Sequence, residues 1–206
     1  MAANLYGGVL LDETLFINQY LSSKIDMQDI KLNVETNYPV DGLIKVSFSG
    51  NKKYIALRIP AWCKNYSINC DYVLKNGYAY IEVGQNTEIL LNMDMSVRVV
   101  KANRMVRENA GRVAVMRGPI VYCLEEIDNG SLLRDVSIEV NSNFTICDNE
   151  FVLPSLKTTA FRFKDCNSLY ESVTESDYVE FEAKFIPYYA FANRNESDMI
   201  VWVLRK

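Results

Sequence analysis

The chain has 206 residues, 49% hydrophobic and 23% charged, and its 22 basic and 26 acidic residues give a formal net charge of -4. This composition is typical of a globular protein with a substantial core and excludes an intrinsically disordered chain. The acidic balance and the lack of a basic run argue against nucleic-acid binding. No apolar stretch reaches the roughly 18 residues that cross a bilayer, and no signal-peptide pattern is visible. We therefore expect neither nucleic acid nor membrane as a partner.

Alternation of apolar and polar residues dominates the first half of the chain. A period of two indicates half-buried strands, because successive side chains of an extended chain point to opposite faces. The spacing of these strands is typical of a β-sandwich and leaves no room for intervening helices. A weaker pattern from Leu10 to Leu21 is the best candidate for a helix. The predicted strands lie near residues 30–35, 44–49, 54–59, 79–83 and 89–99.

The second half shows the same alternation with longer gaps. Its predicted strands lie near residues 112–116, 120–125, 136–140, 144–147, 179–185 and 199–204. The segment 103–111 interrupts the alternation and is the expected junction between two units. We therefore predict an all-β fold of two packed antiparallel β-sandwich units, jelly-roll-like and with little helix. The first unit would span 1–100 and the second 101–198, with the last strand, at about 199–206, as a candidate to return to the first.

Histidine and cysteine usage limits the available chemistry. The sequence has no histidine, which excludes Ser-His and Cys-His nucleophile activation and removes the commonest metal ligand. The five cysteines include no CxxC motif and no adjacent pair. Their odd number argues against a complete disulfide framework and favours a reducing, cytoplasmic location. Cys63 and Cys70 could share a metal, but a structural zinc site needs four ligands, so we expect no metal site within this chain.

The segment 112–130 places Cys123 before Glu125 and Glu126, which raises the question of a nucleophile beside an acid/base. Alternation puts Cys123 mid-strand among aliphatic residues, with no nearby lysine. A buried thiol in such surroundings stays protonated and inert. We therefore interpret the segment as a structural strand, with both glutamates in solvent where the strand ends.

Two other patterns could carry chemistry or binding. Glu180 and Glu182 share one face of a strand, and paired carboxylates about 5–10 Å apart can hydrolyse glycosides. Because the positions between them are apolar, we interpret these glutamates as the wet side of the strand. Tyrosine occurs thirteen times and is part of a dense aromatic cluster at 185–194. Exposed rings there could stack on sugars, whereas buried rings would fill the core or an interface.

Several stretches, taken together, are similar to one known family. RIPAWC at 58–63, NRMVRENAGRVAVMRGPIVYCLEEIDN at 103–129 and IPYYAFANRNESDMIVWV at 186–203 resemble the C-terminal part of glycoside hydrolase family 127. This is the β-L-arabinofuranosidase-like family, formerly domain-of-unknown-function family 1680. LFINQYLSSKI at 15–25 and ETNYPVDG at 35–42 fall where similar patterns occur, although Val40 stands at an expected tryptophan.

The resemblance implies a catalytic (α/α)₆ barrel N-terminal to β-sandwich domains, with this chain as the sandwich part alone. It also implies a zinc-held cysteine nucleophile, in an adjacent Cys-Cys pair upstream, and a glutamate acid/base in the barrel. No position here matches those residues, so we assign no catalytic, cofactor-binding or metal-binding residue to this chain. The implied zinc would belong to the missing barrel.

We therefore expect a non-catalytic accessory region that packs on the barrel of its parent chain and aids a homodimer. The candidate interface residues are Arg104, Arg107, Glu108, Tyr188, Tyr189 and Arg194. One alternative is that Arg107 and Arg194 only fix loops within the sandwich. A second is a carbohydrate-binding module that recognises arabinose-containing glycans through exposed tyrosines, and a third is an autonomous carboxylate hydrolase. Because the missing barrel would leave apolar surface uncovered, we also expect self-association.

Overall fold

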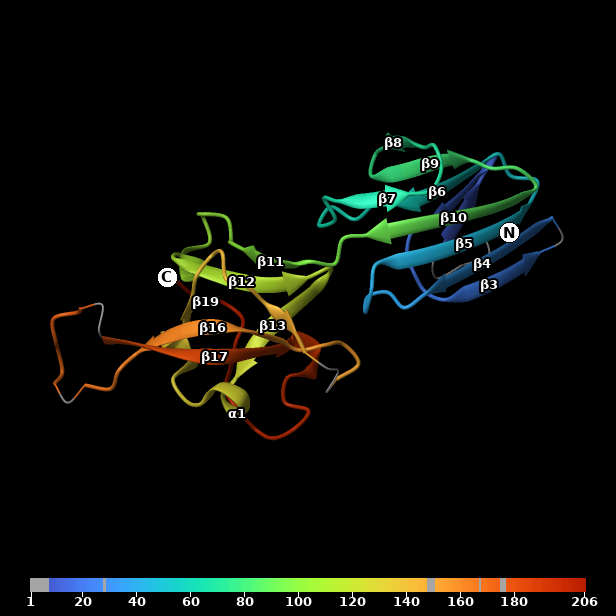
Figure 1. The fold of residues 1–206 in the computed structure, drawn as a ribbon. Helices are drawn as coiled ribbons and strands as arrows, with labels where there is room; N and C mark the ends of the chain where they lie inside the picture. Colours follow the sequence, from blue (N-terminus) through green and yellow to red (C-terminus); the bar gives the residue numbers. More distant parts are fainter. Residues whose placement is uncertain (1–7, 28, 148–150, 167, 175–176) are drawn as a thin grey trace. The chain divides into compact units, whose positions relative to one another are not determined.

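The computed structural model describes residues 8–27, 29–147, 151–166, 168–174 and 177–206. It divides into two compact units, Met1–Met95 and Ser96–Lys206, and both are built from strands (Figure 1). The longest helix in the described residues, α1 (Glu126–Asn129), has four residues. None of the helices there is long and apolar enough to cross a membrane. The predicted all-β class is confirmed.

The first unit is a sandwich of two five-stranded sheets. One sheet has the order β1 (Gly8–Leu11), β2 (Thr14–Ile17), β6 (Tyr54–Arg58), β9 (Tyr78–Glu82) and β8 (Val73–Lys75). The other has the order β3 (Ser23–Met27), β4 (Ile30–Thr36), β5 (Leu43–Gly50), β10 (Asn86–Met93) and β7 (Tyr66–Ile68). Neighbouring strands are antiparallel except β2 and β6, which run parallel.

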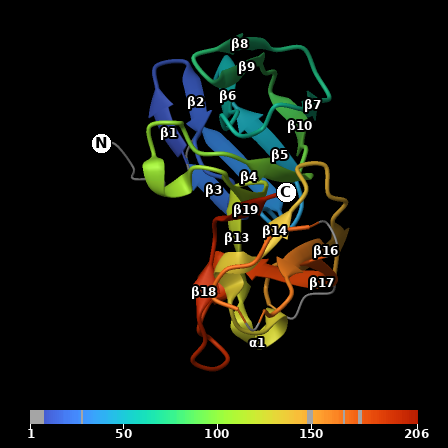
Figure 2. The same cartoon turned by 90° about the vertical axis from the view of Figure 1, so that its left-hand side faces the viewer.

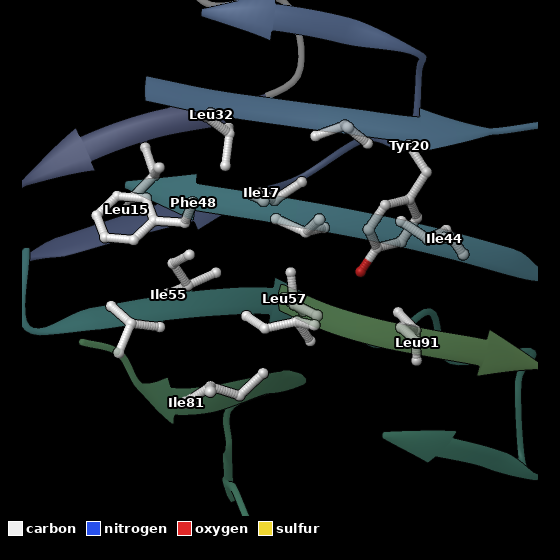
Figure 3. Close-up of a cluster of buried hydrophobic side chains, with 14 of the residues drawn as sticks. Leu15, Ile17, Tyr20, Leu32, Ile44, Phe48, Ile55, Leu57, Ile81 and Leu91 are labelled. Atoms are coloured by element: carbon white, nitrogen blue, oxygen red, sulfur yellow. The ribbon is translucent and has the colours of Figure 1, made fainter. Parts of the chain in front are cut away.

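The core of the first unit lies between these sheets, as Figure 3 shows. Leu57 and Ile81 come from one sheet, and Ile44 and Leu91 come from the other; all four are almost completely buried. Burying a side chain of this size contributes roughly 1.5–3 kcal/mol. Tyr20 closes one end, where its hydroxyl donates a 2.6 Å hydrogen bond to a backbone carbonyl of β6. Alternating aliphatic residues therefore produce this sandwich directly.

The second unit closes on itself. Its elements include β11 (Val97–Val100), β12 (Arg112–Arg117), β13 (Ile120–Glu125), β14 (Ser137–Ile138), β15 (Thr145–Ile146), β16 (Leu156–Phe163), β17 (Tyr178–Pro187), β18 (Met199–Ile200) and β19 (Val203–Arg205). Six of them pair in the order β12-β19-β14-β16-β17-β13, and β13 pairs again with β12. A closed ring leaves no open edge among its members. The unit is thus barrel-like rather than an open sandwich.

Tyr122, Leu156 and Phe185 fill the interior of this ring and are almost fully buried. The Tyr122 hydroxyl donates a 2.9 Å hydrogen bond to the carbonyl of Pro154, which satisfies its polar end. Strands β16 and β17 lie side by side in both views (Figures 1 and 2), and they pair along the whole length of β16. This long ladder forms one wall of the second unit.

The predicted helix at Leu10 to Leu21 is wrong. The segment begins with the hairpin of β1 and β2, in which Leu11 pairs with Thr14 across a tight turn. Asp12 adopts a positive φ of 44° in that turn, a conformation that Asp tolerates better than most residues. Leu15 and Ile17 lie two residues apart, which fits the period of a strand, and both are buried. The short apolar run did not distinguish the two structures.

The predicted strand at 89–99 is two strands in different units. β10 ends at Met93 in the first unit, and β11 pairs with β12 in the second. The unit boundary therefore falls between Met95 and Ser96, before the expected position at residue 100. Apolar and polar residues alternate without a break across the junction, so the sequence pattern does not indicate that the chain passes from one sheet to another. The suggested return of the last strand to the first unit is also incorrect, because β19 pairs with β12 and β14.

Candidate functional site

Four charged side chains meet where β13 ends in the second unit. Glu125 is the last residue of β13, Asp128 lies in α1, Lys184 lies in β17, and Arg194 follows the short 3₁₀ helix η4 (Tyr188–Ala190). We call this set the Arg194 cluster. It joins the strand that carries Cys123 to the aromatic segment 185–194.

Arg194 is the centre of the cluster. Its Nη2 donates to Glu125 Oε2 and to Asp128 Oδ2, and its Nη1 donates to Asp128 Oδ1 at 3.1 Å. Lys184 Nζ donates to the same Asp128 oxygen at 3.2 Å. The other oxygen of Glu125 accepts the backbone N–H of Ala192 at 2.9 Å. Each carboxylate therefore accepts hydrogen bonds at both of its oxygens.

The contacts within the cluster favour the charged forms of Asp128 and Arg194. Burial alone would raise the pKa of Asp128, but hydrogen bonds from Arg194 and Lys184 outweigh it and hold that pKa below its ordinary value. The hydrogen bond to Asp128 raises the pKa of Arg194 further above its already high ordinary value, with a smaller contribution from Glu125. The cluster is thus a set of fixed ion pairs, and the pKa of Asp128 is shifted away from neutral pH, opposite to the shift that a general acid needs.

Asn129 anchors the same corner through the backbone. Its side-chain amide donates to the carbonyls of Glu125, at 2.9 Å, and Lys184, at 3.0 Å. Its side-chain oxygen accepts the backbone N–H of Lys184 at 2.9 Å. Arg162 Nη2 donates to the backbone carbonyl of Asn129 at 2.6 Å. These bonds hold α1 against β17, so that Asp128 and Lys184 stay within reach of Arg194.

Glu125 is not in solvent, as the sequence led us to expect. Only 1% of its surface is exposed, and it lies on the same strand face as Cys123. A buried carboxylate requires a partner, and Arg194 supplies it from a distant part of the chain. Glu126, in contrast, keeps part of its surface exposed.

Cys123 is fully buried and packs with Ile186 and Ala190. Burial, with a smaller contribution from the charge of Glu125, raises the pKa of its thiol to about 12. A buried thiol in that state is protonated at neutral pH and is a poor nucleophile. The prediction that Cys123 lies in a buried strand is confirmed.

The remaining interface candidates lie on the surface of the second unit. Arg104, Arg107 and Glu108 are exposed on and around the 3₁₀ helix η1 (Arg107–Asn109), and Met105 between them is 81% exposed. Tyr188 and Tyr189 are each 49% exposed. The Tyr189 hydroxyl also accepts the backbone N–H of Leu153 at 3.0 Å. Arg194 differs from the others, since it is engaged inside its own unit, in agreement with the alternative that it fixes a loop.

The surface glutamates of β17 behave as expected. Glu180 and Glu182 are exposed, and Glu182 forms a 2.6 Å ion pair with Lys157 on the neighbouring strand. A metal finds no suitable ligand set in the described part of the chain, where no group of three or more Cys, Asp or Glu side chains converges. The described residues therefore do not provide the ligands for the zinc that the resemblance implies. That the zinc is bound in a separate barrel stays a prediction.

Sequence reasoning missed Asp128 and Lys184 as members of the cluster and Asn129 as the residue that anchors it. The spacing of Glu125 and Asp128 offered a weak signal, because residues three apart lie on one face of a helical turn. Nothing in a single sequence indicated that Arg194 would reach both carboxylates. Long-range pairing of this kind becomes visible only when β13 and β17 are placed side by side.

Two family models cover nearly the whole chain. Residues 97–204 match the model described as glycoside hydrolase family 127 C-terminal domain. Residues 14–97 match the model described as beta-L-arabinofuranosidase, GH127 middle domain. The chain belongs to glycoside hydrolase family 127. The two models meet at residue 97, close to the boundary between the two units of the structure.

Individual family 127 proteins support this assignment. The non-reducing end beta-L-arabinofuranosidase of Bifidobacterium longum is 29% identical over 94% of this chain and 33% of its own length. The crystal structure of a GH127 beta-L-arabinofuranosidase from Geobacillus stearothermophilus T6 superposes with a TM-score of 0.85, at 33% identity. The superposition covers 98% of this chain and 35% of the Geobacillus chain. A further solved GH127 beta-arabinofuranosidase has a TM-score of 0.80 at 27% identity, covering 98% of this chain and 36% of its own. The chain therefore spans about a third of the length of these relatives.

Proposed function

We propose that this chain is a non-catalytic accessory region of a β-L-arabinofuranosidase-like glycoside hydrolase, and that it packs against a separate catalytic barrel. The observation that carries the proposal is the engagement of Glu125. The carboxylate nearest Cys123 along the strand is tied to Arg194, and the thiol itself is buried and protonated. The arrangement that resembles a nucleophile and its acid/base in the sequence therefore serves the fold.

Two surfaces of the second unit are suited to contact the barrel. The η1 surface, formed by Arg104, Met105, Val106, Arg107 and Glu108, combines exposed apolar side chains with charges. The η4 surface, formed by Tyr188 and Tyr189, offers two half-exposed rings on a segment fixed by Arg194. Aromatic and arginine side chains are enriched among the residues that dominate protein interfaces. The second part of the proposal is that the parent protein forms a homodimer through one of these two surfaces.

The test uses the full-length parent enzyme and this 206-residue chain in parallel. Tyr188→Ala in the parent is expected to weaken the contact with the barrel, with a loss of about 2 kcal/mol if the ring is a central anchor. Thermal melting and limited proteolysis of the parent measure that loss. The same substitution in the 206-residue chain, where the barrel is absent, is expected to leave the melting temperature nearly unchanged.

Tyr170→Ala is the matched control, because Tyr170 is a highly exposed tyrosine elsewhere in the second unit. It is expected to leave the parent unaffected. Equal behaviour of the Tyr188 and Tyr170 variants in the parent would remove the η4 surface from the proposal.

Arg107→Ala, measured in the same way, tests the η1 surface independently. Light scattering of the parent and of Met105→Asp tests dimerisation, and an unchanged dimer in that variant would exclude the η1 surface from it.

The half-exposed rings of Tyr188 and Tyr189 also favour the alternative of a carbohydrate-binding module for arabinose-containing glycans. Sugar rings stack on exposed aromatic faces, so the alternative predicts saturable binding that Tyr188→Ala abolishes. Titration of the unmodified 206-residue chain and of its Tyr188→Ala variant with arabino-oligosaccharides distinguishes the two functions, because a barrel-contact surface gives no binding that depends on Tyr188.

A further inference from the structure

A shallow groove crosses the outer face of one sheet in the first unit. It runs over β3, β4, β5 and β10, which lie side by side in Figure 1, and it is an open depression with a volume of about 660 Å³. Two rows of outward-facing side chains line it, each with one residue from each strand in register. The first row is Lys24, Asn33, Ser47 and Glu88, and the second is Asp26, Lys31, Ser49 and Asn86.

The hollow follows from side-chain size. Ser47 and Ser49 occupy the middle of the sheet, on β5, while longer side chains project from the strands on both sides. Between the two rows lie Leu32 and Phe48, whose side chains are buried in the core. On β5 only backbone and the small serines are exposed there, which forms a shallow floor. The volume lies within the range of small-molecule sites, roughly 300–1,000 Å³.

The chemistry of the lining selects against a charged ligand. Lys24 and Lys31 contribute two positive charges, and Asp26 and Glu88 contribute two negative charges, so the groove is neutral as a whole. The ion pair of Lys31 with Asp26 spans 3.6 Å, and that of Glu88 with Lys45 spans 3.0 Å, each between exposed side chains. The Asn33 amide donates a 2.7 Å hydrogen bond to Glu35, which is also exposed. Exposed pairs of this kind contribute little stability, so their groups can turn toward a ligand at low cost.

The same groups supply donors and acceptors in alternation. Carboxylates accept, ammonium groups donate, and the amides of Asn33 and Asn86 and the serine hydroxyls do both. A ligand with many hydroxyl groups and no net charge matches this mixture, because each hydroxyl also donates and accepts.

We propose that this groove binds a short, neutral oligosaccharide, held by hydrogen bonds to its hydroxyl groups. The site lies in the first unit and uses no tyrosine, so it is distinct from the η4 surface. This proposal goes beyond the accessory role. It does not depend on that role, because a region that packs on a catalytic barrel can do so with or without a glycan site.

The test is a titration of the 206-residue chain with a neutral arabino-oligosaccharide, followed by calorimetry and by amide chemical shifts. Saturable binding is expected, with shifts concentrated at Asn33, Ser47 and Asn86. Ser47→Tyr fills the hollow at an outward position that tolerates a large side chain, and is expected to weaken binding by at least about tenfold as several hydrogen bonds are lost. Asn86→Ala, at an exposed position, is a second variant that is expected to weaken binding without a change of fold.

Ser67→Tyr is the matched control, because Ser67 is an exposed serine on β7 of the same sheet, outside the groove. It is expected to bind as the unmodified chain does. A charged oligogalacturonide is expected to bind more weakly than the neutral sugar. The proposal is overturned if no neutral oligosaccharide binds, if Ser47→Tyr and Ser67→Tyr bind equally, or if Tyr188→Ala is the variant that abolishes binding. The last result would place the sugar on the η4 surface.

Discussion

Arg194 lies 69 residues after Glu125 in the chain and donates a hydrogen bond to its carboxylate. The same guanidinium binds Asp128, so one side chain ties the segment that follows η4 to the end of β13. Because Glu125 is almost completely buried, this pair is screened little by solvent. The relationship gives Glu125 a structural role and fixes the segment that presents Tyr188 and Tyr189.

Removing the arginine should destabilise the second unit. Arg194→Ala leaves Glu125 buried without its cation, and breaking a buried pair in this way costs about 3–5 kcal/mol. We expect a loss near the lower end of this range, because the Arg194 side chain keeps about a fifth of its surface exposed (22%). Urea denaturation of the 206-residue chain measures the change in the free energy of unfolding.

Arg107→Ala is the control for that experiment, since Arg107 is exposed on η1. It is expected to change the free energy of unfolding by less than about 0.5 kcal/mol, as surface substitutions usually do. If both variants unfold at the same urea concentration, the Arg194 cluster does not stabilise the unit, and Arg194 stays only a candidate interface residue.

Stability should fall on acidification through Asp128. Burial alone would raise the pKa of this carboxyl, but Arg194 and Lys184 hold it below the ordinary value of 3.8. The unfolded chain then binds the proton at a higher pH than the folded chain does. The stabilisation is therefore complete above the unfolded pKa, and is lost as the pH drops through the folded one.

Asp128→Asn removes the protonation of Asp128 and so tests whether this residue causes the loss of stability at low pH. Urea midpoints from about pH 6 to about pH 3 are expected to fall less steeply for the variant than for the unmodified chain. Glu125, Lys184 and Arg194 face Asp128 and are present in both proteins, so their contributions largely cancel in the comparison. Parallel curves for the two proteins would contradict the assignment.

The five cysteines should differ sharply in reactivity. Burial raises the pKa of the Cys123 thiol to about 12, whereas Cys166 is exposed. A short pulse of iodoacetamide at about pH 8 is expected to modify Cys166 and to leave Cys123 unmodified until the chain is unfolded. Peptide mass spectrometry measures both. Rapid alkylation of Cys123 in the folded chain would show an accessible thiolate and reopen the question of a nucleophile.

The parts of the fold that the sequence predicted are those where apolar residues alternate cleanly. Cys123 was placed in a buried strand because its neighbours alternate, and the structure agrees. β16 was missed because Thr158 and Ala160 occupy buried positions where a larger apolar residue would have marked the strand. The closure of the second unit was also missed, since the pairing of β12 with β13 leaves no mark beyond the two strands themselves.

The candidate site was harder to predict than the strands. A glutamate at a strand end usually lies in solvent, so the burial of Glu125 could not be inferred without its partner. Arg194 lay in a segment that had been singled out for its aromatic residues, and an interface role and a loop-fixing role fitted it equally well. The choice between them depends on a contact between β13 and the segment after β17, which periodicity does not encode.

The most direct test of the central claim is the turnover of a nitrophenyl β-L-arabinofuranoside by the 206-residue chain and by the full-length parent. We predict no turnover by the chain alone, because Glu125 is held by Arg194 and Cys123 is buried, and we predict activity in the parent. Hydrolysis by the 206-residue chain that disappears in Cys123→Ala or Glu182→Gln would contradict the account.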